Sequence, residues 1–154
     1  MLRTILVTAV VIATPAKADW QNTRWGSAPA AVEKAIGKKF QAGDPHPASP
    51  DDGHTYASSS YSAGTFKFSA FFEFTSAKLS AVQLTLDDGT ESCTSLLQSL
   101  LSKYGKPVES STTVPQRKLW RDPARNTVVE IAVYADTYCP VKYKPLHSAS
   151  LIGL

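Results

Sequence analysis

Two histidines and three aspartates lie close together in one stretch of the chain, and these side chains are common ligands of divalent metal ions. The stretch holds Asp44, His46, Asp51, Asp52 and His54 within eleven residues. Imidazole nitrogens and carboxylate oxygens together can bind zinc or another divalent cation. The spacing matches no established metal motif, and three prolines between residues 41 and 53 indicate a polar loop without rigid flanks. We therefore expect a solvated loop and no cofactor, with His46 and His54 as the residues of an alternative metal site.

The chain offers no pattern typical of hydrolytic or nucleotide-dependent catalysis. Ser58 to Ser60 and Ser110 to Ser111 form serine runs, but no nucleophile elbow surrounds them. Asp87 and Asp88 precede Gly89 and Thr90, which indicates a turn and a helix cap instead of paired catalytic acids. The sequence also lacks a Gly-rich phosphate loop and a dinucleotide fingerprint. We predict that the protein is not an enzyme.

The two cysteines, Cys93 and Cys139, are expected to form one disulfide. Apolar residues around Cys93 follow the spacing of one buried helical stripe, which comprises Cys93, Leu96, Leu97, Leu100, Leu101 and Tyr104. Cys139 alternates with polar residues in a strand pattern that also turns it toward the core. Closing a loop of about 47 residues would stabilise the fold by roughly 4 kcal/mol in the chain-entropy model. A reactive thiol is the alternative, but no CxxC motif is present.

A further set of residues, aromatic and charged, is expected on the polar face of a sheet. Alternation along the predicted strands turns the following residues outward: Lys67, Phe71, Glu73, Gln83, Thr85, Lys118, Trp120, Tyr134 and Lys142. Protein interfaces are built around aromatic anchors ringed by polar groups. We therefore predict partner contacts at Phe71, Trp120 and Tyr134, with Lys67 and Glu73 beside them. Scattered surface aromatics are the alternative, because a register error of one residue would reverse a strand's faces.

The elements that must position these residues begin with a short helix and three strands. Ser27 can cap a helix that buries Val32 and Ile36 and ends at Gly37. Trp20 and Trp25 precede this helix and either pack against the core or form a second contact site. Strands are expected at residues 55–61, 65–74 and 79–86. In the middle strand, four phenylalanines share one face opposite Lys67, Ser69, Phe71 and Glu73, which is typical of a half-buried antiparallel strand.

The second half repeats this order. Asp88 or Thr90 can cap the helix at residues 91–104, and Gly105 ends it before Pro107. Strands are expected near residues 108–113, 116–121, 127–135 and 139–144, with a hairpin turn at residues 122–126. We predict an α+β fold of tandem α-β-β-β repeats, about 19–87 and 88–154. These would form one antiparallel sheet with the helices packed on one face.

The segment Trp25, Gly26, Ser27, followed by Val32, Ile36 and Gly37, resembles the helix-opening pattern of the SmpA/OmlA group, which includes outer-membrane assembly accessory proteins. The tandem layout of helices and strands also resembles the beta-lactamase inhibitor protein fold. Both resemblances imply a small exported module that binds another protein through a sheet face or loops. Members of the SmpA/OmlA group usually carry a lipid-anchoring cysteine after the signal peptide, whereas this chain has Ala18 followed by Asp19.

The first eighteen residues have the three parts of a secretory signal peptide. Arg3 supplies the positive end, residues 5–13 the apolar run and residues 16–18 the small-residue cleavage site. Cleavage after Ala18 would leave one compact domain, residues 19–154, in the periplasm or outside the cell. The apolar run is shorter than the roughly 20 residues that a membrane span needs, so we expect no transmembrane segment.

The charge of the mature chain argues against nucleic-acid binding. Loss of Arg3 and Lys17 changes the balance from 16 basic against 13 acidic residues to 14 against 13, and the basic residues are scattered along the sequence. We therefore predict an exported, non-catalytic protein-binding domain. Its partner would be another exported or envelope protein, and it would act as an envelope accessory protein or as an inhibitor or immunity protein against a periplasmic or secreted hydrolase. The alternative is a small exported enzyme or metal-binding protein that uses the loop from Asp44 to His54.

Overall fold

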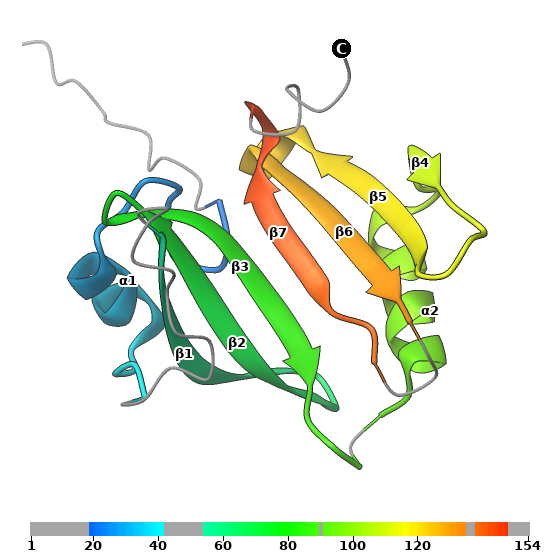
Figure 1. The fold of residues 1–154 in the computed structure, drawn as a ribbon, viewed down its shortest axis with the longest axis horizontal. Coiled ribbons are helices and arrows are strands. Elements are labelled where there is room, and N and C mark those ends of the chain that lie inside the picture. Colours follow the sequence, from blue (N-terminus) through cyan, green and yellow to red (C-terminus); the bar gives the residue numbers. More distant parts are fainter. Residues whose placement is uncertain (1–18, 42–53, 90, 135–137, 148–154) are drawn as a thin grey trace, which may run out of the picture.

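The computed structural model describes residues 19–41, 54–89, 91–134 and 138–147, and over these residues the protein has an α+β fold (Figure 1). Two α-helices accompany one seven-stranded antiparallel sheet in the order β1-β2-β3-β7-β6-β5-β4. The predicted α+β class with one antiparallel sheet is therefore confirmed. The elements in chain order are α1 (Pro29–Ile36), β1 (His54–Ala63), β2 (Phe66–Thr75), β3 (Lys78–Leu86), α2 (Cys93–Tyr104), β4 (Glu109–Ser110), β5 (Gln116–Asp122), η1 (Pro123–Arg125), β6 (Thr127–Val133) and β7 (Val141–Pro145).

Helix α1 starts one residue later than the sequence predicts. Its N-cap is Ala28, which makes no side-chain cap, and Pro29 occupies the first helical position. The predicted cap at Ser27 is therefore wrong. At the other end Gly37 adopts a left-handed conformation, with φ 68° and ψ 21°, and this ends the helix as predicted. Val32 is fully buried, whereas Ile36 is partly buried against the same core.

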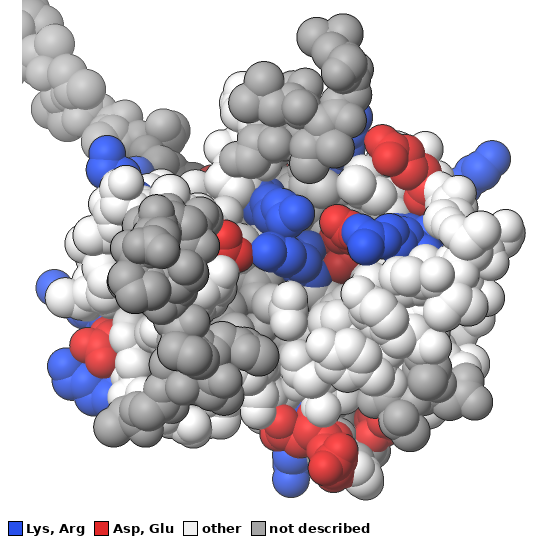
Figure 2. All heavy atoms as spheres, in the orientation of Figure 1, with Lys and Arg blue, Asp and Glu red and all other residues white. Residues whose placement is uncertain are grey.

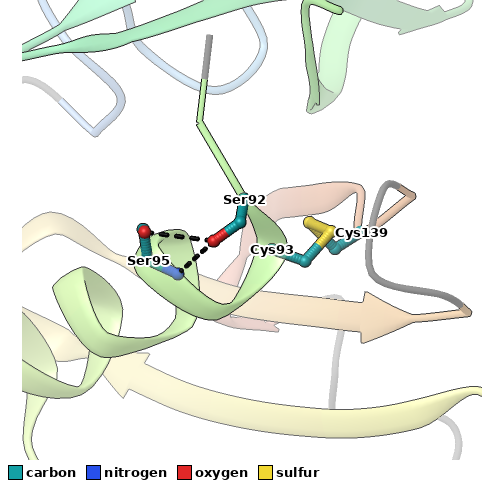
Figure 3. The surroundings of a disulfide bond; sticks show 4 residues. All are labelled: Ser92, Cys93, Ser95 and Cys139. Atoms are coloured by element: carbon teal, nitrogen blue, oxygen red, sulfur yellow. Dashed lines mark hydrogen bonds between the residues drawn. A yellow bond between two sulfur atoms is a disulfide. The ribbon is translucent and has the colours of Figure 1, made fainter. Parts of the chain in front are cut away.

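Helix α2 is capped by a residue that the sequence analysis does not single out. Ser92 accepts a hydrogen bond from the Ser95 backbone N–H at 3.1 Å (Figure 3). The prediction that Asp88 provides the cap is wrong, and Thr90 lies outside the described residues. The predicted apolar stripe is confirmed, because Cys93, Leu96 and Leu100 are buried and the other three members pack against the core.

The predicted disulfide joins the start of α2 to the segment before β7. Cys93 and Cys139 are both buried, their sulfur atoms are bonded and their Cα atoms lie 5.8 Å apart (Figure 3). Cys139 itself lies two residues before β7, so the predicted strand begins too early. The bond closes a sequence separation of 46 residues, which places the stabilisation at roughly 4 kcal/mol in the chain-entropy model.

The strands of the second half lie close to the predicted ranges, except for the later start of β7 and the short strand at the sheet edge. β5 and β6 form the predicted hairpin, and Asn126 adopts a left-handed conformation in the connecting turn. The predicted strand at residues 108–113 is much shorter, since β4 comprises only Glu109 and Ser110. A short edge strand offers few unpaired backbone groups to another chain.

The core lies against one face of the sheet, which we call the inner face. Buried residues of both helices and of the inner face form one cluster, and its large members include Phe72, Val82, Trp120 and Ile131. The opposite face, called the outer face, is turned toward the reader in Figure 1, where α2 lies behind β5 and β6. Burial on β2 alternates residue by residue, so its phenylalanines at positions 66, 68, 72 and 74 face inward as predicted.

The segment before α1 packs into the core and contacts the second half. Trp20 is buried among aromatic rings, with its centroid 5.5 Å from that of Phe72. Asn126 lies in the β5–β6 turn, and its backbone oxygen accepts a hydrogen bond from the Trp25 indole N–H at 3.1 Å. In the described residues, no helix is long and apolar enough to cross a membrane.

Candidate functional site

The outer face of the sheet carries one row of side chains that crosses all seven strands. Strand register places these residues next to one another in the order Ser58, Phe71, Gln83, Lys142, Glu130, Leu119 and Glu109. Neighbours in such a row have Cβ atoms about 4.5–5.5 Å apart. Ser58 is buried, whereas the other six members are partly or fully exposed and form one continuous surface. The chain thus brings together residues that lie up to 84 positions apart in sequence, from Ser58 to Lys142.

Four of the five predicted partner contacts belong to the outer face or its edge. Phe71 and Glu73 are partly exposed on β2, and Lys67 is exposed near the start of the same strand. Tyr134 follows β6 and is 47% exposed. Its ring lies 5.3 Å from that of Tyr138, which is 46% exposed, so these two tyrosines form an exposed aromatic pair.

The prediction that Trp120 is an exposed contact is wrong. Trp120 pairs with Val129 on the inner face and is only 1% exposed. Its indole N–H donates to the Gly105 backbone oxygen at 2.9 Å, and its ring lies 6.1 Å from that of Tyr104. Lys118, two residues away in an extended strand, shares this inner face. The predicted register of β5 is therefore reversed, and Arg117, Leu119 and Arg121 are the outward residues.

Basic residues outnumber acidic ones on the part of the outer face formed by β5, β6 and β7. The outward residues there include Arg117, Arg121, Lys142 and Lys144 against one carboxylate, that of Glu130. Figure 2 shows Lys and Arg side chains across the middle of this face, with acidic side chains between them. We call these four cations and Glu130 the basic patch.

Two cations of the basic patch form ion pairs with carboxylates of the described residues. Arg117 contacts Glu130 at 2.8 Å, and Lys142 contacts Glu73 of β2 at 2.9 Å. Arg121 and Lys144 flank Val128 in a second row, and neither forms a salt bridge with a carboxylate of the described residues. The patch therefore keeps a positive surplus beside the central row.

A cavity of about 360 Å³ lies on the other side of the sheet, between the inner face, α2 and the segment from Asp19 to Gln21. Tyr61, Tyr104 and Tyr143 line it from β1, α2 and β7. The sequence pattern places Tyr104 and Tyr143 at core-facing positions, but no spacing in the sequence brings all three together. This cavity is the feature that the sequence analysis missed.

Burial raises the pKa of two of these tyrosine hydroxyls. Desolvation raises the pKa of Tyr143 strongly, and the neighbouring Tyr104 and Tyr61 raise it further. Desolvation also raises the pKa of Tyr61, again with a contribution from Tyr104. Arg125, which lines the same cavity, acts in the opposite direction and lowers both pKa values. The cavity thus presents neutral hydroxyl donors close to a fixed positive charge.

The candidate metal loop lies almost wholly outside the described residues, which resume at His54, the first residue of β1. Within the described part of the chain, no group of three or more His, Cys, Asp and Glu side chains could hold a metal ion. His147 is exposed, and its Nδ1 lies 3.2 Å from the Asn126 side-chain oxygen.

Comparison with known proteins gives one family match. Residues 18–144 match the family model of the TP0088 domain. No curated protein and no solved structure matches the chain. The matched range covers both helices and almost the whole sheet as well as more than half of the sequence. The chain therefore belongs to the TP0088 domain family.

Proposed function

We propose that the protein is an exported, non-catalytic binding domain that contacts another exported or envelope protein through the outer face of its sheet. The row of outer-face side chains carries this proposal, because its exposed part joins an aromatic ring, amide and charged groups and the aliphatic Leu119 across the sheet from β2 to β4. Protein interfaces combine these side-chain types around partly apolar centres. The surplus charge of the basic patch favours a partner with an acidic surface.

Export is supported by the sequence and by the cysteine chemistry. The signal pattern of residues 1–18 would direct the chain to the periplasm or the exterior, with cleavage after Ala18. Disulfides persist in oxidising compartments, and both cysteines of this chain are paired with each other. The mature protein is then one compact domain from Asp19 to Leu154.

We also propose that the domain is a tandem repeat, about 19–87 and 88–154, with both helices on one face of the sheet. Two features support this arrangement. Each half contains a helix followed by an antiparallel meander, of three strands in the first half and of three strands after the two-residue β4 in the second. The last strands of the two meanders, β3 and β7, pair with each other. Val32 of α1 and Leu96 of α2 belong to the same inner-face core cluster.

The resemblances to the SmpA/OmlA group and to beta-lactamase inhibitor proteins favour two roles for such a module. We propose either an envelope accessory protein or an inhibitor, including an immunity protein, that binds a periplasmic or secreted hydrolase. In the inhibitor case, the outer face or its aromatic edge at Tyr134 and Tyr138 would cover the active-site cleft of the hydrolase.

The test is affinity capture from the envelope and secreted proteins of the source, with variants that change the outer face alone. The variants are Lys144→Glu, which reverses a charge in the basic patch, and Tyr134→Ala at the exposed aromatic edge. Lys34→Glu is the matched charge-reversal control, because Lys34 is exposed on α1. Circular dichroism and thermal unfolding confirm that each variant is folded.

The expected result is one enriched protein, retained by Lys34→Glu and lost or strongly reduced with the two outer-face variants. Binding of the purified partner should weaken as salt is added, because charge complementarity is screened. Equal capture by the wild type, the outer-face variants and the control would refute the outer face as the contact surface.

A further inference from the structure

The cavity under the sheet has two chemically different parts. Its interior is formed by aromatic and aliphatic side chains of β2, β3 and α2, among them Phe66, Phe68, Leu84 and Leu96. Its polar side carries the hydroxyls of Tyr61, Tyr104 and Tyr143. A volume of about 360 Å³ is in the range of roughly 300–1,000 Å³ that small-molecule sites occupy.

The cavity continues into a shallow hollow of about 610 Å³ at the protein surface. Gln21, Lys103, Tyr104, Asp122 and Arg125 line both, so these residues mark the mouth between the cavity and the hollow. A ligand can therefore place one end among apolar side chains while the other end remains at a polar, hydrated surface.

Positive charge dominates this mouth. Lys103 and Arg125 are exposed there, and Arg121 adds a third cation to the hollow, against the carboxylate of Asp122. Asp19 lines the cavity behind the mouth, and its carboxylate accepts a hydrogen bond from the Trp25 backbone N–H at 2.9 Å. None of the three cations forms a salt bridge with a carboxylate of the described residues. Lys103 instead lies over the Tyr104 ring, with its Nζ 5.0 Å from the ring centroid. Two cations without carboxylate partners among the described residues thus lie at a mouth that Tyr104 also lines, and Tyr61 and Tyr143 line the cavity behind it.

We propose that this cavity binds a small amphiphilic carboxylate, with its apolar body against the aliphatic and aromatic interior and its carboxylate at the mouth beside Arg125 and Lys103. A carboxylate has only acceptor oxygens, which match ammonium, guanidinium and hydroxyl donors. The apolar body removes hydrocarbon surface from water. A neutral ligand of the same shape would still bury its hydrocarbon surface, but it would not form the charged hydrogen bonds.

Arg125 and the tyrosines come from separate elements, which makes the site depend on the complete fold. Arg125 lies in the β5–β6 turn, Lys103 on α2 and Tyr61 on β1. The outer face lies across the sheet from this cavity, although Arg121 belongs both to the basic patch and to the hollow. Lys144 lines neither the cavity nor the hollow, and Arg125 is not part of the basic patch, so variants at these two residues test the protein contact and this proposal independently.

The experiment uses the protein exported by a bacterial host, so that processing and disulfide formation follow that route. Isothermal titration calorimetry compares decanoate, which has both parts of the proposed ligand, with decanol, which lacks the charge, and with acetate, which lacks the body. We expect decanoate to bind at least about tenfold more tightly than decanol, since a hydrogen bond to a charged group contributes roughly 1.5–3 kcal/mol. Acetate should not bind measurably at the same concentrations.

Two variants with matched controls locate the binding site. Arg125→Gln should weaken decanoate about tenfold and leave decanol unchanged, whereas Arg117→Gln on the outer face should alter neither. Ser99→Phe places a ring at the cavity wall from the exposed side of α2 and should abolish binding of both, whereas Ser102→Phe, exposed on the same helix, should not.

Chemical shifts of backbone amides in the decanoate complex provide an independent map, with changes expected around Tyr61, Tyr104 and Arg125. The proposal is refuted if decanol binds as tightly as decanoate, or if Ser99→Phe binds decanoate like the wild type. Shift changes confined to the outer face would refute it as well, because the ligand would then occupy a different surface.

Discussion

Trp120 is the single residue that fixes which face of β5 is buried. The neighbouring residues do not decide which face is buried. Arg117, Leu119 and Arg121 lie on one face and Lys118 on the other, and the long aliphatic parts of these side chains give the first face at least as much apolar surface as Lys118 gives the second. The Trp120 side chain is too large to be left in water when a buried position and a backbone acceptor, the Gly105 oxygen, are both available. One indole therefore turns the two arginines outward and builds half of the basic patch.

The first prediction follows from the buried indole hydrogen bond of Trp120. Trp120→Phe removes the donor, leaves the Gly105 oxygen without it and reduces the buried volume, so the free energy of unfolding should fall by about 2–3 kcal/mol. Urea unfolding followed by circular dichroism measures the change. Tyr134→Phe, at an exposed position, should change stability by less than about 0.5 kcal/mol. Equal effects of the two substitutions would mean that Trp120 does not anchor β5.

The second prediction concerns alkaline pH and the Tyr143 hydroxyl. Its folded-state pKa is raised by burial and by Tyr104 and Tyr61, against the opposing charge of Arg125, whereas its unfolded pKa is about 10. Above that pH the unfolded chain loses a proton that the folded protein still holds, so this contribution to stability is complete below about pH 10 and decreases as pH rises. The stability of Tyr143→Phe should therefore decline less steeply in this range.

Urea unfolding at several pH values from about 8 to 11 tests this difference, with phenolate absorbance recorded in parallel. The exposed Tyr138→Phe serves as control and should follow the wild-type pH dependence. Identical slopes for Tyr143→Phe and the wild type would show that the Tyr143 hydroxyl is not held protonated by the fold.

Elements with a strong apolar period could be predicted from the sequence, and elements decided by local geometry could not. The stripe of α2 and the alternation of β2 place many apolar residues on one face, so few alternative arrangements bury them all. The cap of α2 is decided by one hydrogen bond, and Ser92 and Asp88 have similar intrinsic capping ability, whereas α1 begins after Ala28 without any side-chain cap. The cavity depends on where β1, α2 and β7 meet, which no local pattern contains.

The third prediction separates the capping residue of α2 from the sequence-based candidate for α1. Ser92→Ala removes the acceptor of the Ser95 N–H and should lower the free energy of unfolding by about 1 kcal/mol. Ser27→Ala should have a much smaller effect, because Ser27 is not the N-cap of α1. Thermal and urea unfolding of both variants provide the comparison. A larger loss with Ser27→Ala would contradict the observed helix start.

At the scale of the whole molecule, the two halves are joined by a narrow seam in the sheet and by the N-terminal segment. β3 and β7 share only three residue pairs, Val82 with Tyr143, Gln83 with Lys142 and Leu84 with Val141. The segment at residues 19–25 adds contacts to the β5–β6 turn, since the Thr127 hydroxyl donates to the Asp19 backbone oxygen at 3.1 Å. The first residues after the expected cleavage site thus stabilise the second half of the fold.

The fourth prediction tests this connection through Trp25. Trp25→Phe removes the indole donor to the Asn126 oxygen and to the Thr127 hydroxyl oxygen, while the Leu146 N–H still donates to the former. The free energy of unfolding should therefore fall by only about 0.5–1.5 kcal/mol. Hydrogen exchange should show a local effect as well: the amides of Asn126 and Leu146, which close the β5–β6 turn, should exchange faster relative to those of α2. Tyr138→Phe is the control. A selective increase in exchange rate at the turn would show that the N-terminal segment stabilises the contact between the two halves. If exchange of all amides in Trp25→Phe instead accelerates by the same factor, the segment stabilises the fold only globally.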